Sequence, residues 1–100
     1  MIQDAQKPDN VADWDGAKKL VDQAIAEFGA LDVVINNAGI GHMQPFRDIH
    51  METYDRIFAV NTRGTFMMCR EAARCIEEGG RIVNISSGIT VANSEGMALY

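Results

Sequence analysis

Two short runs of aliphatic, mostly β-branched residues constrain the fold of this chain more than any other feature. The first lies in LDVVINNAG (31–39) and the second in RIVNISS (81–87). Such nearly continuous apolar runs are typical of strands that are buried on both faces of a parallel sheet. Because a helical pattern precedes each run, the sequence predicts an α/β fold with right-handed crossovers between parallel strands.

Both predicted helices carry end signals. Asp13 can cap a helix that runs to Phe28, and Gly29 suits the left-handed conformation that ends it. A second, longer helix is predicted over residues 51–78, with an interruption near Gly64 and a stop at the two glycines that follow. The apolar residues of the first helix recur on one face at helical spacing: Ala17, Leu20, Val21, Ala24, Ile25 and Phe28.

Charge and hydropathy exclude several classes of function. The formal net charge is −5 and no basic residues cluster, so we expect no nucleic-acid interface. No apolar stretch is long enough to predict a membrane span, and the polar N-terminus lacks the apolar core of a signal peptide. We therefore expect a cytoplasmic protein. Three arginines of the longer helix are explained by a solvated face: Arg63, Arg70 and Arg74.

The cysteines and histidines predict neither a disulfide nor a metal site. Cys69 and Cys75 are six residues apart, a spacing that fits neither a CxxC redox pair nor a zinc site. We expect both to be free thiols, as in a reducing compartment. His42 and His50 have no neighbouring ligand at metal spacing, so no metal site is predicted.

Amide and small residues end the first predicted strand. Ligands of open α/β sheets bind outside the carboxyl ends of the strands, where Ala38 and Gly39 would let a flat ligand approach the backbone. An ordinary strand-ending turn is the alternative, since asparagine and glycine are common in turns. Gly39 and Gly41 form a G-x-G, but Gln44 stands where the dinucleotide fingerprint needs a third glycine, so that motif is rejected.

Three further polar residues are candidates for chemistry. Asn61 falls on the apolar face of the longer helix, where an unpaired amide would cost about 1–3 kcal/mol, so it needs partners. A structural hydrogen bond to a loop is one alternative for it. Ser87 ends the second strand and Tyr100 follows thirteen residues later, so their hydroxyls can converge on a carbonyl oxygen. The alternative is that each residue is structural, Ser87 as a serine that ends a strand and Tyr100 as a tyrosine that packs against the protein.

The set of motifs is more specific than its members. NNAG (36–39), FAVNTRGTF (58–66), GRIVNISS (80–87) and a tyrosine thirteen residues after the second serine resemble the short-chain dehydrogenase/reductase family. The resemblance covers residues 10–100, and the C-terminal part resembles members of the 3-oxoacyl-carrier-protein reductase type. It implies a partial Rossmann fold, a doubly wound parallel sheet of which about two buried strands and two helices are present.

The resemblance also implies roles for individual residues. Tyr100 matches the family's general acid/base, Ser87 the residue that holds the substrate oxygen, and Asn61 the anchor of a proton-relay water. The residues that match the cofactor-binding positions are Asn37, Ala38 and Gly39 beside the adenosine and ribose, and Asn10 and Val11 beside the adenine ring. Asn36 and Asn84 match residues that brace the strands.

The implied activity is hydride transfer between NAD or NADP and a small-molecule carbonyl compound or secondary alcohol. Since the family commonly pairs through the longer helix, we expect a homo-oligomer through residues 51–78, with Phe66 and Met67 on the outer face.

Two family elements lie outside these 100 residues. They are the Gly-rich pyrophosphate turn, which precedes the first strand of the family fold, and the lysine four residues after the catalytic tyrosine. We therefore expect residues 1–100 to be the central part of a single NAD(P)-binding domain that folds poorly and does not catalyse alone. The alternative is a catalytically inactive, truncated product that at most binds a nucleotide or a partner chain.

Overall fold

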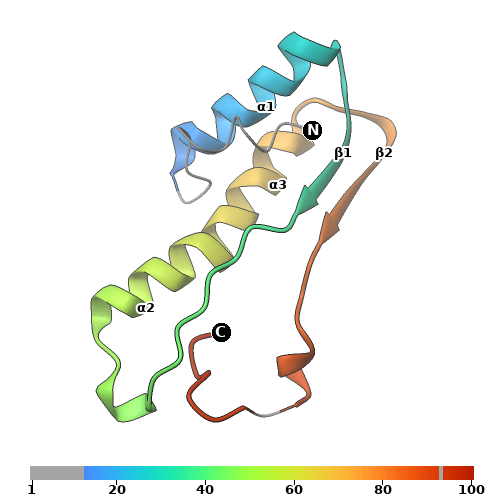
Figure 1. Cartoon of the computed structure of the whole chain (residues 1–100). Coiled ribbons are helices and arrows are strands. Elements are labelled where there is room, and N and C mark those ends of the chain that lie inside the picture. Colours follow the sequence, from blue (N-terminus) through green and yellow to red (C-terminus); the bar gives the residue numbers. More distant parts are fainter. Residues whose placement is uncertain (1–12, 93) are drawn as a thin grey trace.

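A computed structural model describes residues 13–92 and 94–100 of the chain (Figure 1). The order of elements is helix α1 (Trp14–Phe28), strand β1 (Leu31–Asn36), helix α2 (Met51–Phe58), a π-helical turn (Ala59–Gly64), helix α3 (Thr65–Ala73) and strand β2 (Ile76–Asn84). Short 3₁₀ turns lie at Phe46–Asp48 and Gly88–Thr90. β1 and β2 pair in parallel, which confirms the α/β prediction.

The first helix has the predicted ends. The Asp13 side chain accepts a hydrogen bond from the backbone N–H of Asp15, and Gly29 has a φ of 85°. At the C-terminus the N–H of Gly29 bonds to the carbonyl of Ile25, 2.8 Å away. Both caps satisfy backbone groups that a helix end leaves without an intrahelical partner.

The prediction for the end of the longer helix was wrong. We predicted a helix to Glu78 and a strand from Arg81, but α3 ends at Ala73 and β2 begins at Ile76. Leu31 pairs with Ile76 and Val33 with Arg81, so residues 77–80 form an irregularity in the ladder. Gly79, at a φ of 81°, lies within this strand rather than at a helix end, as glycines of β-bulges do.

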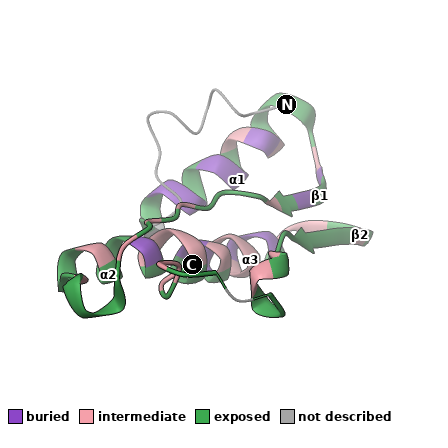
Figure 2. Ribbon diagram, turned by 60° about the horizontal axis from the view of Figure 1, so that its bottom comes forward, coloured by how far each residue is buried: buried purple, intermediate pink, exposed green. Residues whose placement is uncertain are grey.

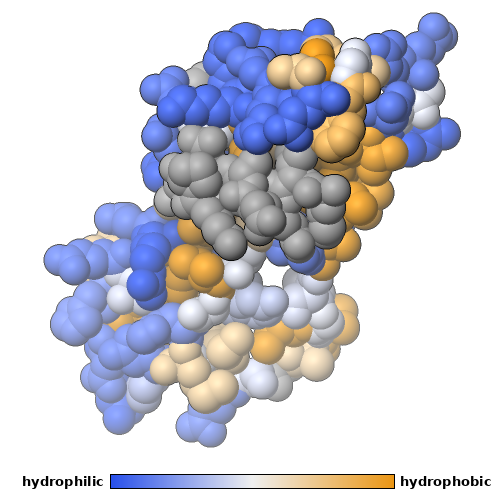
Figure 3. Space-filling model, turned by 45° about the horizontal axis from the view of Figure 1, so that its top comes forward, coloured by the Kyte–Doolittle hydropathy of each residue, from blue (hydrophilic) through white to orange (hydrophobic). Residues whose placement is uncertain are grey.

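The core lies on one face of the sheet only. It contains Val21, Ala24, Leu31, Val34 and Ala72, with Ile25, Met68, Cys75 and Ile76 packed around them (Figure 2). Helices α1 and α3 both contribute to this cluster, so both pack on the same face of the sheet. No described element covers the other face. Val33 and Ile35 are 54% and 62% exposed, so within residues 1–100 one face of strands that are patterned for burial on both faces stays in water, as expected where only two helices are present. Figure 3 shows hydrophobic side chains along the side of the molecule where the strands lie.

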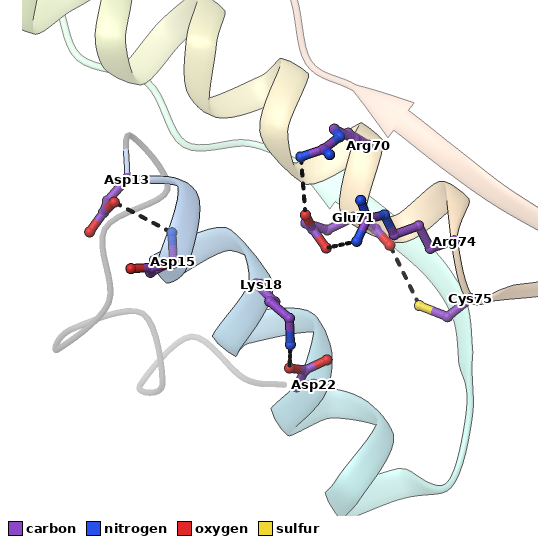
Figure 4. Close-up of polar contacts among 8 residues, drawn as sticks. All are labelled: Asp13, Asp15, Lys18, Asp22, Arg70, Glu71, Arg74 and Cys75. Atoms are coloured by element: carbon purple, nitrogen blue, oxygen red, sulfur yellow. Dashed lines mark hydrogen bonds and ion pairs between the residues drawn. The ribbon is translucent and has the colours of Figure 1, made fainter.

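Among the described residues, one charged side chain is buried. It belongs to Glu71, which has 5% of its surface exposed. Its carboxylate lies 3.7 Å from Arg70 Nη1 and 3.9 Å from Arg74 Nη1 (Figure 4). A buried carboxylate needs such counter-charges, because desolvation of an unpaired charge is costly. Met67 is also buried, at 6% exposure, which corrects its assignment to the outer face. Helix α3 therefore buries a wider part of its surface than the one apolar face that we predicted.

Cys75 provides a prediction about thiol reactivity. Its thiol donates to the Glu71 carbonyl at 3.6 Å, and burial, followed by the nearby carboxylates of Asp22 and Glu71, raises its pKa. The folded state therefore favours the neutral thiol, a stabilisation that is lost as pH rises from the unfolded to the folded pKa. In a complete Cys69→Ser protein, alkylation of Cys75 should have a pH midpoint above that of glutathione. The urea-unfolded protein should match glutathione, and a folded midpoint at or below it would contradict the prediction.

Within residues 13–92 and 94–100, no helix combines the length and apolar character that a bilayer crossing requires.

Candidate active site

The carboxyl ends of the two strands carry a braced pair of amides. Asn36 pairs with Asn84 in the register, and its Nδ2 donates to Asn84 Oδ1 at 2.8 Å and to Cys69 Sγ at 3.4 Å. The side-chain bond ties the strand ends together, in agreement with the bracing role that we expected. Directly after it come Asn37, Ala38 and Gly39, all exposed. The backbone at this edge is therefore open to a ligand.

Asn61 fixes the loop that follows these residues. Its Oδ1 accepts from the N–H of Ile40 at 2.9 Å, and its Nδ2 donates to the carbonyl of Ile40 at 2.8 Å. The π-turn places this amide toward the loop, and Thr65 Oγ1 donates to the Asn61 carbonyl at 3.2 Å. The predicted need for partners is confirmed, and they are the loop backbone groups that we considered as an alternative.

Tyr100 packs over the same loop, one residue further along. A methyl group built on Gly41 would lie 3.3 Å from Tyr100 Cδ2, so the phenol ring rests directly on this glycine. The ring is half-exposed. The backbone N–H of Gln44 also donates to the carbonyl of Gly96 at 2.9 Å, which holds the segment before Tyr100 against the loop. Asn61 and Tyr100 thus converge on residues 40–41.

Ser87 lies just beyond β2, at the same edge of the sheet. Its Oγ accepts from the N–H of Ile89 at 3.3 Å and so caps the 3₁₀ turn Gly88–Thr90. Within the described part of the chain, no hydrogen bond joins Ser87 to Asn61 or to Tyr100. Asn10 and Val11, the other predicted cofactor residues, lie outside the described residues.

Sequence reasoning missed the contributions of Ile40 and Gly41. Ile40 acts through its backbone, which no side-chain pattern reveals. Gly41 did give a signal, because it is the second glycine of the G-x-G that fails the dinucleotide fingerprint. A side chain at position 41 would crowd the Tyr100 ring, which explains a glycine there without any phosphate binding.

Gly96 gives a stability prediction for this docking. Its φ is 78°, and a Cβ built there would lie 3.0 Å from Met43 Cγ. Gly96→Ala should destabilise the docked segment by about 1–2 kcal/mol, the cost of the left-handed conformation for an L-residue. Thermal unfolding and hydrogen exchange at Gln44 in the complete protein measure the effect. Gly88→Ala is the matched control for stability, since its added Cβ would meet nothing within 4 Å; equal effects would refute the argument.

Comparisons with known proteins identify the family of the chain. A family model described as short chain dehydrogenase matches residues 4–100. Versicolorin reductase stcU of Emericella nidulans is 49% identical over 78 residues, which are 78% of this chain and 30% of that protein. The chain therefore spans about a third of the length of this curated relative.

Solved structures show the same likeness. A short-chain dehydrogenase/reductase from Serratia marcescens BCRC 10948 matches with a TM-score of 0.84 and 36% identity, over 91% of this chain and 42% of that one. A short chain dehydrogenase from Burkholderia cenocepacia J2315, solved in complex with NADP, matches with a TM-score of 0.86 and 35% identity, over 92% of this chain and 38% of that one. The Rossmann-type fold class predicted from the sequence is confirmed. The family-model match and the similarity to solved structures show that the chain belongs to the short-chain dehydrogenase family.

Proposed function

We propose that the complete protein is an NAD(P)-dependent oxidoreductase that transfers hydride between nicotinamide and a carbonyl compound or a secondary alcohol. Residues 1–100 would be the central part of its single cofactor-binding domain. The observation that carries the proposal is the convergence of Asn61 and Tyr100 on the loop that leaves the open strand end at 37–39. The Burkholderia relative with bound NADP supports the choice of cofactor class.

The strand end fits a dinucleotide. Asn37, Ala38 and Gly39 are exposed, and a Cβ built on Gly39 would approach only Asn61 Oδ1, at 3.6 Å. Small side chains at this position let a ribose and a flat base lie against the backbone, as at the switch point of other doubly wound sheets. When bound, the nicotinamide supplies or accepts the hydride.

The hydroxyl groups of the chain would handle the substrate oxygen. In the reductive direction, the Tyr100 phenol gives its proton to the carbonyl oxygen. Ser87 can donate a hydrogen bond to the same oxygen, because it accepts from Ile89 and its own O–H remains available. Such donors stabilise the negative charge that develops on the oxygen during hydride addition.

Asn61 would act indirectly, without contacting the substrate. Both ends of its amide are engaged by Ile40, so the side chain positions the loop under Tyr100. Its main-chain carbonyl accepts from Thr65 Oγ1 at 3.2 Å, and the family resemblance assigns the anchoring of a relay water to this residue. This division agrees with the role that the family resemblance implies for the residue.

Steady-state kinetics of the complete protein tests the proposal. Nicotinamide absorbance is followed with NADH and NADPH against a panel of ketones and alcohols, and cofactor affinity is measured separately. Cofactor-dependent turnover is the expected result. Tight cofactor binding without turnover of any carbonyl or alcohol would favour the alternative, a non-catalytic nucleotide-binding protein.

The free thiols Cys69 and Cys75 suit a cytoplasmic enzyme.

Self-association through the α2–α3 helix is a further expected property of the complete protein. Phe66 of α3 is 62% exposed, and an exposed apolar group of this size is typical of interfaces. Phe66→Asp should shift the assembly toward monomer in light scattering at micromolar concentration. Phe28→Asp is the control, since Phe28 is similarly exposed, at 66%, but lies on α1. A monomeric parent protein, or assembly that survives Phe66→Asp, would count against this interface.

A further inference from the structure

We propose that Cys69 is a positioning residue for the cofactor segment, by which we mean residues 37–39. Asn61 holds the chain just after this segment through both backbone groups of Ile40. A second contact lies just before the segment, where the Cys69 thiol accepts a hydrogen bond from Asn36. The inference rests on the proposed function, because it concerns the placement of the same cofactor, but the contacts themselves can be measured without a cofactor.

Cys69 completes a triangle of hydrogen bonds at the strand ends. Asn36 Nδ2 donates to Asn84 Oδ1 at 2.8 Å and to Cys69 Sγ at 3.4 Å. Cys69 Sγ in turn donates to Asn84 Oδ1 at 3.9 Å. An amide nitrogen has two N–H donors, an amide oxygen has two lone pairs, and a thiol can both accept and donate. Both donors of Asn36, both lone pairs of Asn84 Oδ1 and the thiol proton are therefore used.

The triangle requires a side chain at position 69 that both accepts and donates. A serine hydroxyl has both capacities, whereas alanine and valine have neither. Asn84 is exposed, so water can replace the thiol as a partner of the two amides when Cys69 is removed. We therefore expect removal of the thiol to loosen the strand ends more than it lowers the free energy of unfolding.

One continuous helical run holds the cofactor segment from both sides. Asn61 lies in the π-helical turn that leads directly into α3, and Cys69 lies on α3 itself, which contacts both strands (Figure 1). The three residues between the two contacts are exposed, so their backbone is fixed at each end and still open to a ligand. A site held by a rigid element needs less ordering when it binds, which favours affinity.

The affinity of the complete protein for NADH and NADPH tests this role. Cys69→Ala should weaken binding of the tighter of the two by about three- to tenfold, the scale of one lost hydrogen bond. Cys69→Val should do the same although it fills the space of the thiol, and Cys69→Ser should restore the parent affinity. Cys75→Ala is the matched control and should bind as the parent does, since that thiol donates to the Glu71 carbonyl of the preceding turn. Equal affinities of Cys69→Ala and the parent would overturn the positioning role.

Hydrogen exchange without cofactor separates this inference from the proposed function. The Ile85 N–H donates to the Asn36 carbonyl at 3.1 Å, so its exchange reports on the strand ends. Its exchange should be about three- to tenfold faster in Cys69→Ala and Cys69→Val than in the parent or Cys69→Ser, with the amides of α1 unchanged. Parent-like exchange in Cys69→Ala, or faster exchange in α1 as well, would overturn the inference even in an active oxidoreductase. Faster exchange confined to the strand ends, in a protein that binds neither dinucleotide, would support the contact and refute the proposed function.

Discussion

Tyr100→Phe in the complete protein should lower kcat by about 10²–10⁴-fold, the range that a general acid or base contributes. The substitution deletes one hydroxyl and keeps the ring, so the contact with Gly41 and the docking of the segment remain. Cofactor affinity should stay within the error of the parent value, because the proposed cofactor residues precede the loop. Single-turnover kinetics, which isolates the hydride-transfer step, is the appropriate measurement.

The chain offers a matched control for this substitution. Tyr54, the other tyrosine, stacks on Phe58 with ring centroids 4.4 Å apart and lies on α2, away from the strand ends. Tyr54→Phe removes the same atom from a residue with no proposed role, and it should leave turnover unchanged. If Tyr100→Phe kept more than half of the parent rate, Tyr100 would not be the proton donor.

Asn61→Ala should lower kcat by about 10–100-fold, because it leaves two backbone groups of Ile40 without partners at about 1–3 kcal/mol each. Part of this energy would appear as disorder of the loop on which Tyr100 packs. Asn61→Asp should also be impaired, since it keeps the acceptor for the Ile40 N–H but turns an oxygen toward the Ile40 carbonyl.

Hydrogen exchange at Ile40 distinguishes the two variants at position 61. Exchange of the Ile40 amide should be faster in Asn61→Ala than in Asn61→Asp, since only the aspartate retains the acceptor. Thr62→Ala, in the same π-turn at an exposed position, serves as the control and should alter neither exchange nor rate. Unchanged exchange in Asn61→Ala would show that the bidentate contact does not hold the loop in solution.

Elements with local end signals were predictable from the sequence. Helix α1 begins and ends as expected, because Asp13 and Gly29 act through contacts within a few residues. The start of β2 was not predictable, since Gly79 and Gly80 stop helices and also occur in irregular strands. Only the pairing of Leu31 with Ile76, which is long-range, decides between these outcomes.

The candidate site divides in the same way. Residues whose type carries the chemistry, such as Tyr100 and Ser87, stand out in the sequence, although their roles remain predictions. The amide of Asn61 was predicted to have partners, but their identity depended on where the loop after β1 runs. The burial of Met67 depended on tertiary packing, which a single helical wheel does not contain.

The contacts of the loop at 40–41 also imply an order of assembly. The bond from Asn61 to Ile40 closes a loop of 21 residues, whereas the Tyr100 ring meets Gly41 only when the rest of the segment has been made. At a synthesis rate of about 5–20 residues per second, Asn61 leaves the ribosome about 2–8 s before Tyr100. During that interval the shorter closure can form, since its entropic cost is the lower of the two. The loop on which Tyr100 packs can therefore fold before Tyr100 itself has been released from the ribosome.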